Sequence, residues 1–159
     1  MTFHVLMVCT GNICRSPMAE GLLRHLLPPQ LKTAVAVSSA GTYGLHGNRA
    51  EPFAIQAAAA YGADISGHRA RILEASLIRS ADLVLAMENY HLRKINDLLF
   101  LRCRYAQLLG SFDIQRKNPE IEDPYGLPRG AYEISAKEIV ACMPGLIAAL
   151  QTKMEEKAP

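Results

Sequence analysis

Near the N-terminus, residues 5–18 read VLMVCTGNICRSPM. Four apolar residues, 5–8, end abruptly at Cys9, and polar and glycine positions follow. Beyond them, apolar side chains recur with a spacing near 3.6 residues, which indicates a helix. Ser16 and Pro17 suit its first turn, because a serine can cap free amides and a proline is tolerated at a helix start. The segment therefore predicts a strand, a tight loop and a helix.

The remaining chain alternates between strand-like and helix-like patterns. Further strands are expected at 35–39, 82–87 and 105–109. Further helices are expected at 52–61, 73–79, 88–99 and 131–154, with a long polar surface loop at 110–130. Such alternation favours a parallel sheet with helices on both faces, since right-handed crossovers leave few other packings. Ligands bind such sheets beyond the carboxyl ends of the strands, and Cys9 stands at such an end.

Length and composition are typical of a single domain, residues 1–159, in the cytoplasm. Half of the 159 residues are hydrophobic, and 17 basic against 15 acidic residues leave a net charge of +2. This balance gives no reason to expect a nucleic-acid partner. The apolar run 5–8 is too short for a signal peptide or for insertion into a membrane. The four cysteines lack both paired metal-binding spacing and the density of a disulfide scaffold, so we expect mainly thiols.

The loop after the first strand has the chemistry of an anion site. Backbone amides and the helix N-terminus concentrate positive charge there. A guanidinium at Arg15 can hold two phosphate oxygens at once. The same surroundings favour a thiolate at Cys9, which we expect to attack phosphorus and form a phosphocysteine. A buried, inert thiol is the alternative for Cys9, and the strand-loop-helix context argues against it.

Residues 8–20, VCTGNICRSPMAE, closely resemble the phosphate loop of the low-molecular-weight protein-tyrosine phosphatases. The resemblance continues in order through SSAG at 38–41, GHRAR at 67–71, ME at 87–88 and DPYG at 123–126. It implies an α/β fold: a single-domain, flavodoxin-like three-layer sandwich, with a four-stranded parallel sheet and helices on both faces. It also implies a phosphatase that hydrolyses phosphotyrosine without a metal.

The resemblance assigns roles within the loop. It makes Cys9 the nucleophile, Arg15 the phosphate clamp and Ser16 a hydroxyl donor to the thiolate. Asn12 would hold the loop in shape through Ser39 and His68. Without the resemblance, these two residues are an end-of-strand hydroxyl and a surface-loop histidine. The remaining members of the phosphate-binding set are Thr10, Gly11, Ile13 and Cys14.

Two of these loop residues bear on substrate and on redox behaviour. In the related protein-arginine phosphatases a threonine stands at the position of Ile13, whereas an apolar residue goes with phosphotyrosine. The alternative is that Ile13 merely packs. Cys14 lies five residues after Cys9, and family members with this second cysteine form a protective disulfide on oxidation. A Cys9–Cys14 disulfide is therefore one possible regulatory device.

A general acid must come from elsewhere in the chain. Phosphotyrosine leaves as a phenolate whose conjugate acid has a pKa of about 10, so its departure needs a proton donor. An Asp-Pro pair is by itself usually a turn. The resemblance nevertheless makes Asp123 the acid, and afterwards the base that activates water. Tyr125 would form one wall of the substrate slot, and either Tyr43 or Leu45 the opposite wall.

Two other functions compete with this interpretation. An arsenate reductase on the same scaffold needs further cysteines in a mobile segment, and residues 77–95 contain none. A module that binds phosphoproteins without turnover needs neither Cys9 nor Asp123. The similarity to bacterial members implies a tyrosine-phosphorylated protein as the partner, with a bacterial tyrosine autokinase of exopolysaccharide export as one example.

Overall fold

The structure, a computed structural model, describes residues 1–157. Its strands are β1 (Phe3–Cys9), β2 (Val35–Gly41), β3 (Leu83–Ala86) and β4 (Ala106–Leu108). They form one four-stranded sheet in the order β2-β1-β3-β4, and every pairing is parallel. The flavodoxin-like arrangement predicted from the sequence is thereby confirmed.

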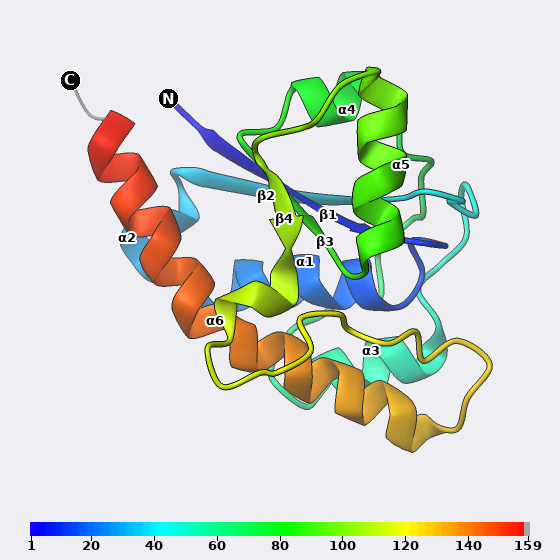
Figure 1. Cartoon of the computed structure of the whole chain (residues 1–159). Coiled ribbons are helices and arrows are strands. Elements are labelled where there is room, and N and C mark those ends of the chain that lie inside the picture. The colour runs from blue at the N-terminus through cyan, green and yellow to red at the C-terminus, as the bar shows by residue number, and fades with distance from the viewer. Residues whose placement is uncertain (158–159) are drawn as a thin grey trace.

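Helices cover both faces of the sheet (Figure 1). One face carries α1 (Arg15–Leu26), α3 (Pro52–Ala59) and α6 (Arg129–Lys157). The other face carries α4 (Ala75–Arg79) and α5 (Asn89–Leu99). The short helix α2 (Pro29–Lys32) and the 3-10 turn η1 (Leu109–Phe112) are too brief to show a period in the sequence. The three-layer sandwich is therefore complete within the described residues.

Strand β1 lies in the middle of the sheet and connects its two hydrophobic cores. Val5, Met7 and Cys9 belong to the core beneath α1 and α6. Leu6 and Val8 belong to the core beneath α5. Successive side chains of a strand point to opposite faces, so a strand buried on both sides reads as a continuous apolar run. This burial fixes the direction in which β1 delivers Cys9 to the carboxyl edge of the sheet.

Most observed boundaries lie within a few residues of the predicted ones, but the predicted capping role of Ser16 is wrong. The N-cap of α1 is Cys14, and no side chain caps this helix. The Ser16 hydroxyl is instead engaged by Asn12 and by the Cys9 sulfur. The loop before the helix competes successfully for this hydroxyl, because Ser16 is buried next to it.

The outer edge of β2 is covered by two guanidinium groups. Arg24 Nη2 donates to the carbonyl of Val37 at 2.5 Å, and Arg71 Nε donates to the carbonyl of Ser39 at 2.9 Å. An edge strand with free carbonyls is a template for pairing with another chain, and charged side chains block such pairing. The two arginines therefore close the sheet on this side.

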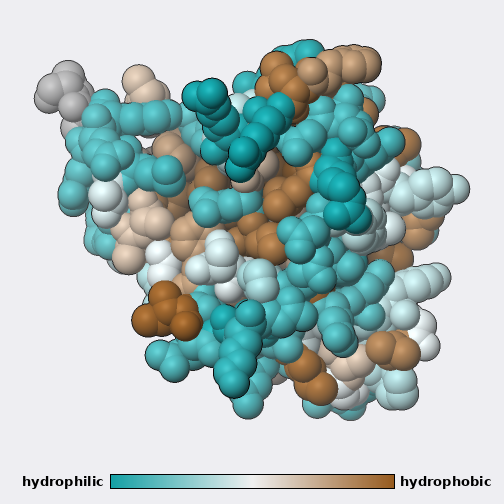
Figure 2. Space-filling model, viewed as in Figure 1, coloured by the Kyte–Doolittle hydropathy of each residue, from teal (hydrophilic) through white to brown (hydrophobic). Residues whose placement is uncertain are grey.

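The opposite edge strand, β4, has only three residues. On the face shown in Figure 2, hydrophilic side chains predominate, and hydrophobic atoms gather between α5 and α6 around β4.

Within residues 1–157, no helix is both long enough and apolar enough to cross a bilayer.

Candidate active site

Residues 10–14 form a loop between β1 and α1 with free backbone donors. Within residues 1–157, the N–H groups of this loop donate no hydrogen bond to another protein group. Five neighbouring amides without acceptors form a concave anion site, because each contributes partial positive charge. The loop therefore has the donor set that a phosphate requires.

Asn12 is the centre of the hydrogen bonds that hold this loop. Its φ of 58° is left-handed, a conformation that asparagine tolerates better than most residues. Its side-chain amide donates to Ser16 Oγ at 2.8 Å and to Ser39 Oγ at 2.9 Å. Its Oδ1 accepts from the Arg71 backbone at 2.9 Å, and its carbonyl accepts from His68 Nε2 at 2.6 Å. The structure thus brings Ser39 and His68 to Asn12, where the resemblance placed them.

The Cys9 sulfur lies 2.9 Å from Ser16 Oγ. Because Ser16 Oγ already accepts a hydrogen bond from Asn12, its own proton is available to the sulfur. Cys9 is only 2% exposed, yet it borders a pocket of about 290 Å³. That pocket is lined by Cys9, Thr10, Gly11, Ile13, Cys14, Arg15, Tyr43, Leu45, Asp123 and Tyr125.

Arg15 is almost fully buried, with 1% of its surface exposed. Its guanidinium forms an ion pair with Glu88, donates to the carbonyl of Ile121 at 2.7 Å, and lies 3.4 Å from Asp123 Oδ2. Burial alone lowers its pKa, but the neighbouring Cys9, Asp123 and Glu88 raise it, and the net shift is upward. Arg15 Nε has no hydrogen-bond partner among the described residues. One N–H of the buried cation is therefore left for an oxygen ligand.

Asp123 reaches the pocket through the long loop before α6. The Ile121 N–H donates to the carbonyl of Met87 at 2.9 Å, at the end of β3. Asp123 Oδ1 accepts from the Tyr125 backbone at 3.1 Å, which closes an Asx turn. Because these contacts dock the loop against the carboxyl edge of the sheet, Asp123 and Tyr125 both line the Cys9 pocket.

Backbone hydrogen bonds join the segment after β2 to the phosphate loop. Tyr43 donates to the carbonyl of Thr10 at 2.9 Å, and Leu45 to that of Gly11 at 3.1 Å. A Cβ atom at Gly41 would lie 2.3 Å from the Thr10 carbonyl oxygen, so only glycine permits this approach. The side chains of both Tyr43 and Leu45 line the pocket, where the sequence left a choice between them.

The family model of the low molecular weight phosphotyrosine protein phosphatases matches residues 4–156. The chain belongs to this family. The phosphatase is similar to Etp of Escherichia coli strain K12, a low molecular weight protein-tyrosine-phosphatase. The two are 40% identical over 129 residues, or 81% of this chain and 82% of Etp. The Etp name and the family description identify the chain as a protein-tyrosine phosphatase, which argues against the reductase and the binding module.

Two solved structures extend the comparison. The tyrosine phosphatase Wzb from Escherichia coli K30, in complex with sulphate, superposes with a TM-score of 0.81. Its sequence is 31% identical, over 94% of this chain and 99% of Wzb. The YwlE arginine phosphatase from Geobacillus stearothermophilus has a TM-score of 0.85 and 31% identity, over 99% of this chain and 98% of YwlE.

The phosphatase also uses residues for which sequence reasoning assigned no role. His91 accepts from the Glu88 N–H at Nδ1, at 3.0 Å, so the ring proton is on Nε2. That proton is donated to Thr10 Oγ1 at 3.0 Å. Burial and the nearby Arg15 lower the pKa of His91 to about 3, so the ring is neutral. The only signal in the sequence was its position three residues after Glu88, as in a capping box.

The cysteines of the phosphatase are all free thiols. Cys14 donates to the Tyr132 hydroxyl at 3.7 Å. Burial is the main cause that raises the pKa of Cys14 to about 12, with smaller contributions from Cys9 and Asp123, while the hydrogen bond with Tyr132 acts in the opposite direction. Cys14 is thus a protonated thiol near Cys9, and a Cys9–Cys14 disulfide stays a prediction.

Proposed function

We propose that the phosphatase hydrolyses phosphotyrosine in proteins through a phosphocysteine intermediate on Cys9. The observation that carries this proposal is that Cys9, Arg15 and Asp123, which come from two separate segments of the chain, line one pocket of about 290 Å³. A nucleophile, a cation that holds phosphate and an acid within one pocket are the parts that phosphoryl transfer by covalent catalysis needs.

In the first step, the Cys9 thiolate attacks phosphorus and the bond to the phenolic oxygen breaks. Asp123 gives its proton to that oxygen, so tyrosine leaves as a neutral phenol. In the second step, a water molecule attacks the phosphocysteine while the Asp123 carboxylate takes one of its protons. The sulfur leaves as a thiolate, stabilised by the Ser16 hydroxyl at 2.9 Å. Phosphate is released, and both groups return to their initial states.

The phosphate itself is bound by the free amides of residues 10–14 and by Arg15. The three nonbridging oxygens of the transferred phosphoryl group carry the negative charge. The amides and the guanidinium stabilise this charge without having to rearrange. Glu88 and the Ile121 carbonyl position the guanidinium. The Asn12 hydrogen bonds to Ser39 and His68 hold the loop in its left-handed shape.

The aromatic ring of the substrate lies between Tyr125 and the wall formed by Tyr43 and Leu45. Both tyrosines are largely exposed at the mouth of the pocket, so they can stack on an incoming ring. Ile13 is buried and also borders the pocket. An apolar side chain at this depth suits the edge of a phenyl ring better than a charged guanidinium.

The substrate of the enzyme is a tyrosine-phosphorylated protein, and a bacterial tyrosine autokinase of exopolysaccharide export is the partner we propose. One domain spanning residues 1–159 acts in the cytoplasm without a cofactor. The match of the family model to residues 4–156 supports the single domain.

Turnover of p-nitrophenyl phosphate tests the mechanism. We expect Cys9→Ser to abolish turnover, and Asp123→Ala to lower kcat by about 10² to 10⁴, the contribution of a general acid. Cys103→Ser is the matched control, because this cysteine is buried in the other core. Turnover that survives in Cys9→Ser would exclude the phosphocysteine pathway.

Peptide substrates test the substrate class. The similarity to the YwlE arginine phosphatase makes phosphoarginine the second candidate. We expect the highest kcat/KM for a phosphotyrosine peptide, compared with phosphoarginine and phosphoserine peptides of the same flanking sequence. A preference for phosphoarginine would overturn the substrate assignment and leave the role of Cys9 intact.

A further inference from the structure

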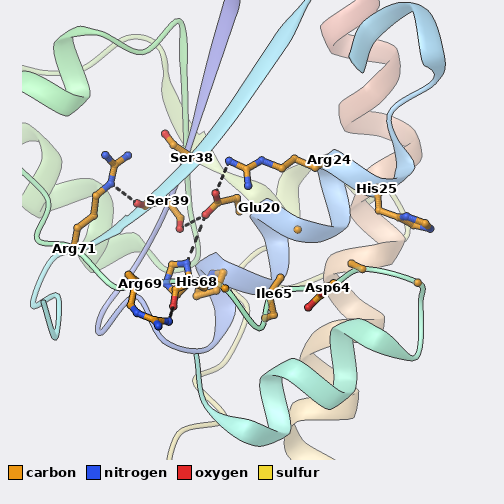
Figure 3. A pocket seen from close by; sticks show the side chains of 15 residues that line it. Glu20, Arg24, His25, Ser38, Ser39, Asp64, Ile65, His68, Arg69 and Arg71 are labelled. Carbon is orange, nitrogen blue, oxygen red and sulfur yellow. Dashed lines mark hydrogen bonds and ion pairs between the residues drawn. The ribbon is translucent and has the colours of Figure 1, made fainter. Parts of the chain in front are cut away.

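A second cavity, of about 710 Å³, lies beside the edge strand β2 (Figure 3). We call it the rear pocket. It is bordered by α1, by the end of β2 and by residues 62–71, and it contains neither Cys9 nor Asp123. Its volume is within the range of pockets that bind small organic molecules. The mechanism proposed above makes no use of it as a binding site.

Cationic side chains surround the rear pocket. Three arginines line it, Arg24, Arg69 and Arg71, against the carboxylates of Glu20 and Asp64. Arg69 uses Nη1 for the carbonyl of His68 at 2.9 Å, and Arg71 uses Nε for the carbonyl of Ser39. The remaining N–H groups of these two arginines form no hydrogen bond within residues 1–157. Guanidinium groups with free donors are suited to phosphate and carboxylate.

The oxygens of Glu20 are already engaged by neighbouring protein groups, and Asp64 is the other carboxylate of the lining. Glu20 Oε1 lies 2.7 Å from Arg24 Nη2, and Glu20 Oε2 accepts from the Ser39 hydroxyl at 2.5 Å. Figure 3 shows the Glu20 carboxylate between Arg24, Ser39 and His68. The charged lining therefore has one positive charge in excess, with three arginines against two carboxylates, and Arg69 and Arg71 carry its free donors.

One part of the lining is apolar and small. Pro17, Ala63 and Ile65 border the pocket together with glycines 21, 62 and 67. Ala63 and Ile65 are buried, so their contact surface is fixed by the core. An apolar wall beside free guanidinium groups fits a ligand with a hydrophobic body and an anionic group.

The rear pocket shares its inner wall with the phosphate loop. Ser39, His68 and Arg71 line the pocket, and each of them forms a hydrogen bond with Asn12. Asn12 in turn donates to Ser16, whose hydroxyl contacts the Cys9 sulfur. A continuous chain of hydrogen bonds therefore leads from the rear pocket to the proposed nucleophile.

We propose that the rear pocket is an effector site for a small organic anion, a phosphate, phosphonate or carboxylate on an apolar body. Such a ligand binds Arg69 and Arg71 and thereby fixes residues 67–71. Because His68 and the Arg71 backbone hold Asn12 in its left-handed conformation, a filled rear pocket favours the formed phosphate loop. Anions then bind more tightly in the Cys9 pocket. The coupling rests on the proposed function, whereas the binding does not.

Amide-resolved NMR titration tests the binding. The probes are phenylphosphonate, benzoate and hexanoate, added to the protein whose Cys9 pocket is filled with tungstate; benzyl alcohol is the uncharged control. We expect at least one probe to shift the amides of residues 62–71, and benzyl alcohol to shift none. Arg69→Glu should abolish the shifts, while Arg93→Glu, an exposed arginine on α5, should leave them unchanged. The same binding should persist in Cys9→Ser, even if that variant disproved the catalytic proposal.

Tungstate inhibition of p-nitrophenyl phosphate turnover tests the coupling. We expect the binding probe to lower the inhibition constant of tungstate by about fivefold or more, the usual lower range of coupling between two sites. Arg69→Glu should remove this effect. The proposal is overturned if no probe shifts residues 62–71, if Arg69→Glu binds as the wild type does, or if binding leaves the tungstate constant unchanged.

Discussion

The pocket that contains Cys9 is built from two regions that differ in burial and in hydrogen bonding. The phosphate loop is buried: Asn12 and Ser16 have no exposed surface, and their side-chain polar groups are paired. The walls are open, with Tyr43 77% and Tyr125 59% exposed. The difference indicates a division of labour. In the proposed mechanism, the preorganised loop binds the phosphoryl group, and the exposed aromatic walls contact the group that carries it.

The sharpest way to test this contrast is to change the cation of the loop. Arg15→Lys keeps the charge but loses the planar fork and the unpartnered Nε. We expect kcat/KM for p-nitrophenyl phosphate to fall by about 10² to 10³, as for the loss of one transition-state donor. Arg93→Lys on the surface of α5 is the control. An Arg15→Lys enzyme within twofold of wild type would show that the fork is dispensable.

The next largest effect is expected at Asn12. Asn12→Ala removes three side-chain hydrogen bonds and leaves the left-handed conformation without support. We expect kcat to fall by about 10², because a small misplacement of the loop suffices for this. The free energy of unfolding in urea should also fall, by about 1–3 kcal/mol. Asn48→Ala, at an exposed site, should change neither quantity. Full activity in Asn12→Ala would mean that the loop keeps its shape unaided.

His91, which donates a hydrogen bond to Thr10 of the phosphate loop, makes the stability of the protein sensitive to acid. The pKa of His91 is lowered from 6.5 to about 3 in the folded protein. Between these two values, the unfolded chain therefore binds a proton that the folded protein does not bind. Stability is therefore present above pH 6.5 and is lost as pH falls toward 3, by up to about 1.4 kcal/mol per pH unit.

Urea unfolding between pH 7 and pH 4 measures this loss. His91→Gln should be less stable at pH 7, because the Thr10 and Glu88 hydrogen bonds change. The free energy of unfolding of this variant should nevertheless change less steeply with pH, because unfolding takes up one proton fewer. His46→Gln, exposed in the wall segment, should keep the wild-type slope. An identical slope in His91→Gln would contradict a neutral, buried imidazole.

The smallest effect is expected at the walls. Tyr125→Ala should raise KM for a phosphotyrosine peptide by about 2- to 10-fold, the range of one aromatic contact. The urea midpoint should not move, since the side chain is mostly exposed. A large loss of stability in this variant would contradict the separation between a structural loop and a recognition wall.

Much of the fold was predictable because its signals are local. The apolar run of β1, the glycine and asparagine that follow, and the helical period of α1 each reflect backbone preferences of neighbouring residues. Local preferences alone predicted the wrong role for Ser16, a helix cap, and only the resemblance assigned its hydroxyl to the Cys9 sulfur. A serine next to a helix start usually caps it, whereas here Asn12 and Cys9 draw the hydroxyl into the loop.

The sequence by itself determined the order of strands and helices, the loop with Cys9 and Arg15, and, through its resemblance, the candidate acid Asp123. Only the tertiary structure decided which distant groups surround them. Glu88 and His91 reach the loop because β3 runs parallel beside β1. Arg71 reaches it because the segment after α3 returns along the edge of β2. Buried charges and left-handed residues require partners, but their chemistry does not say from which part of the chain the partners come.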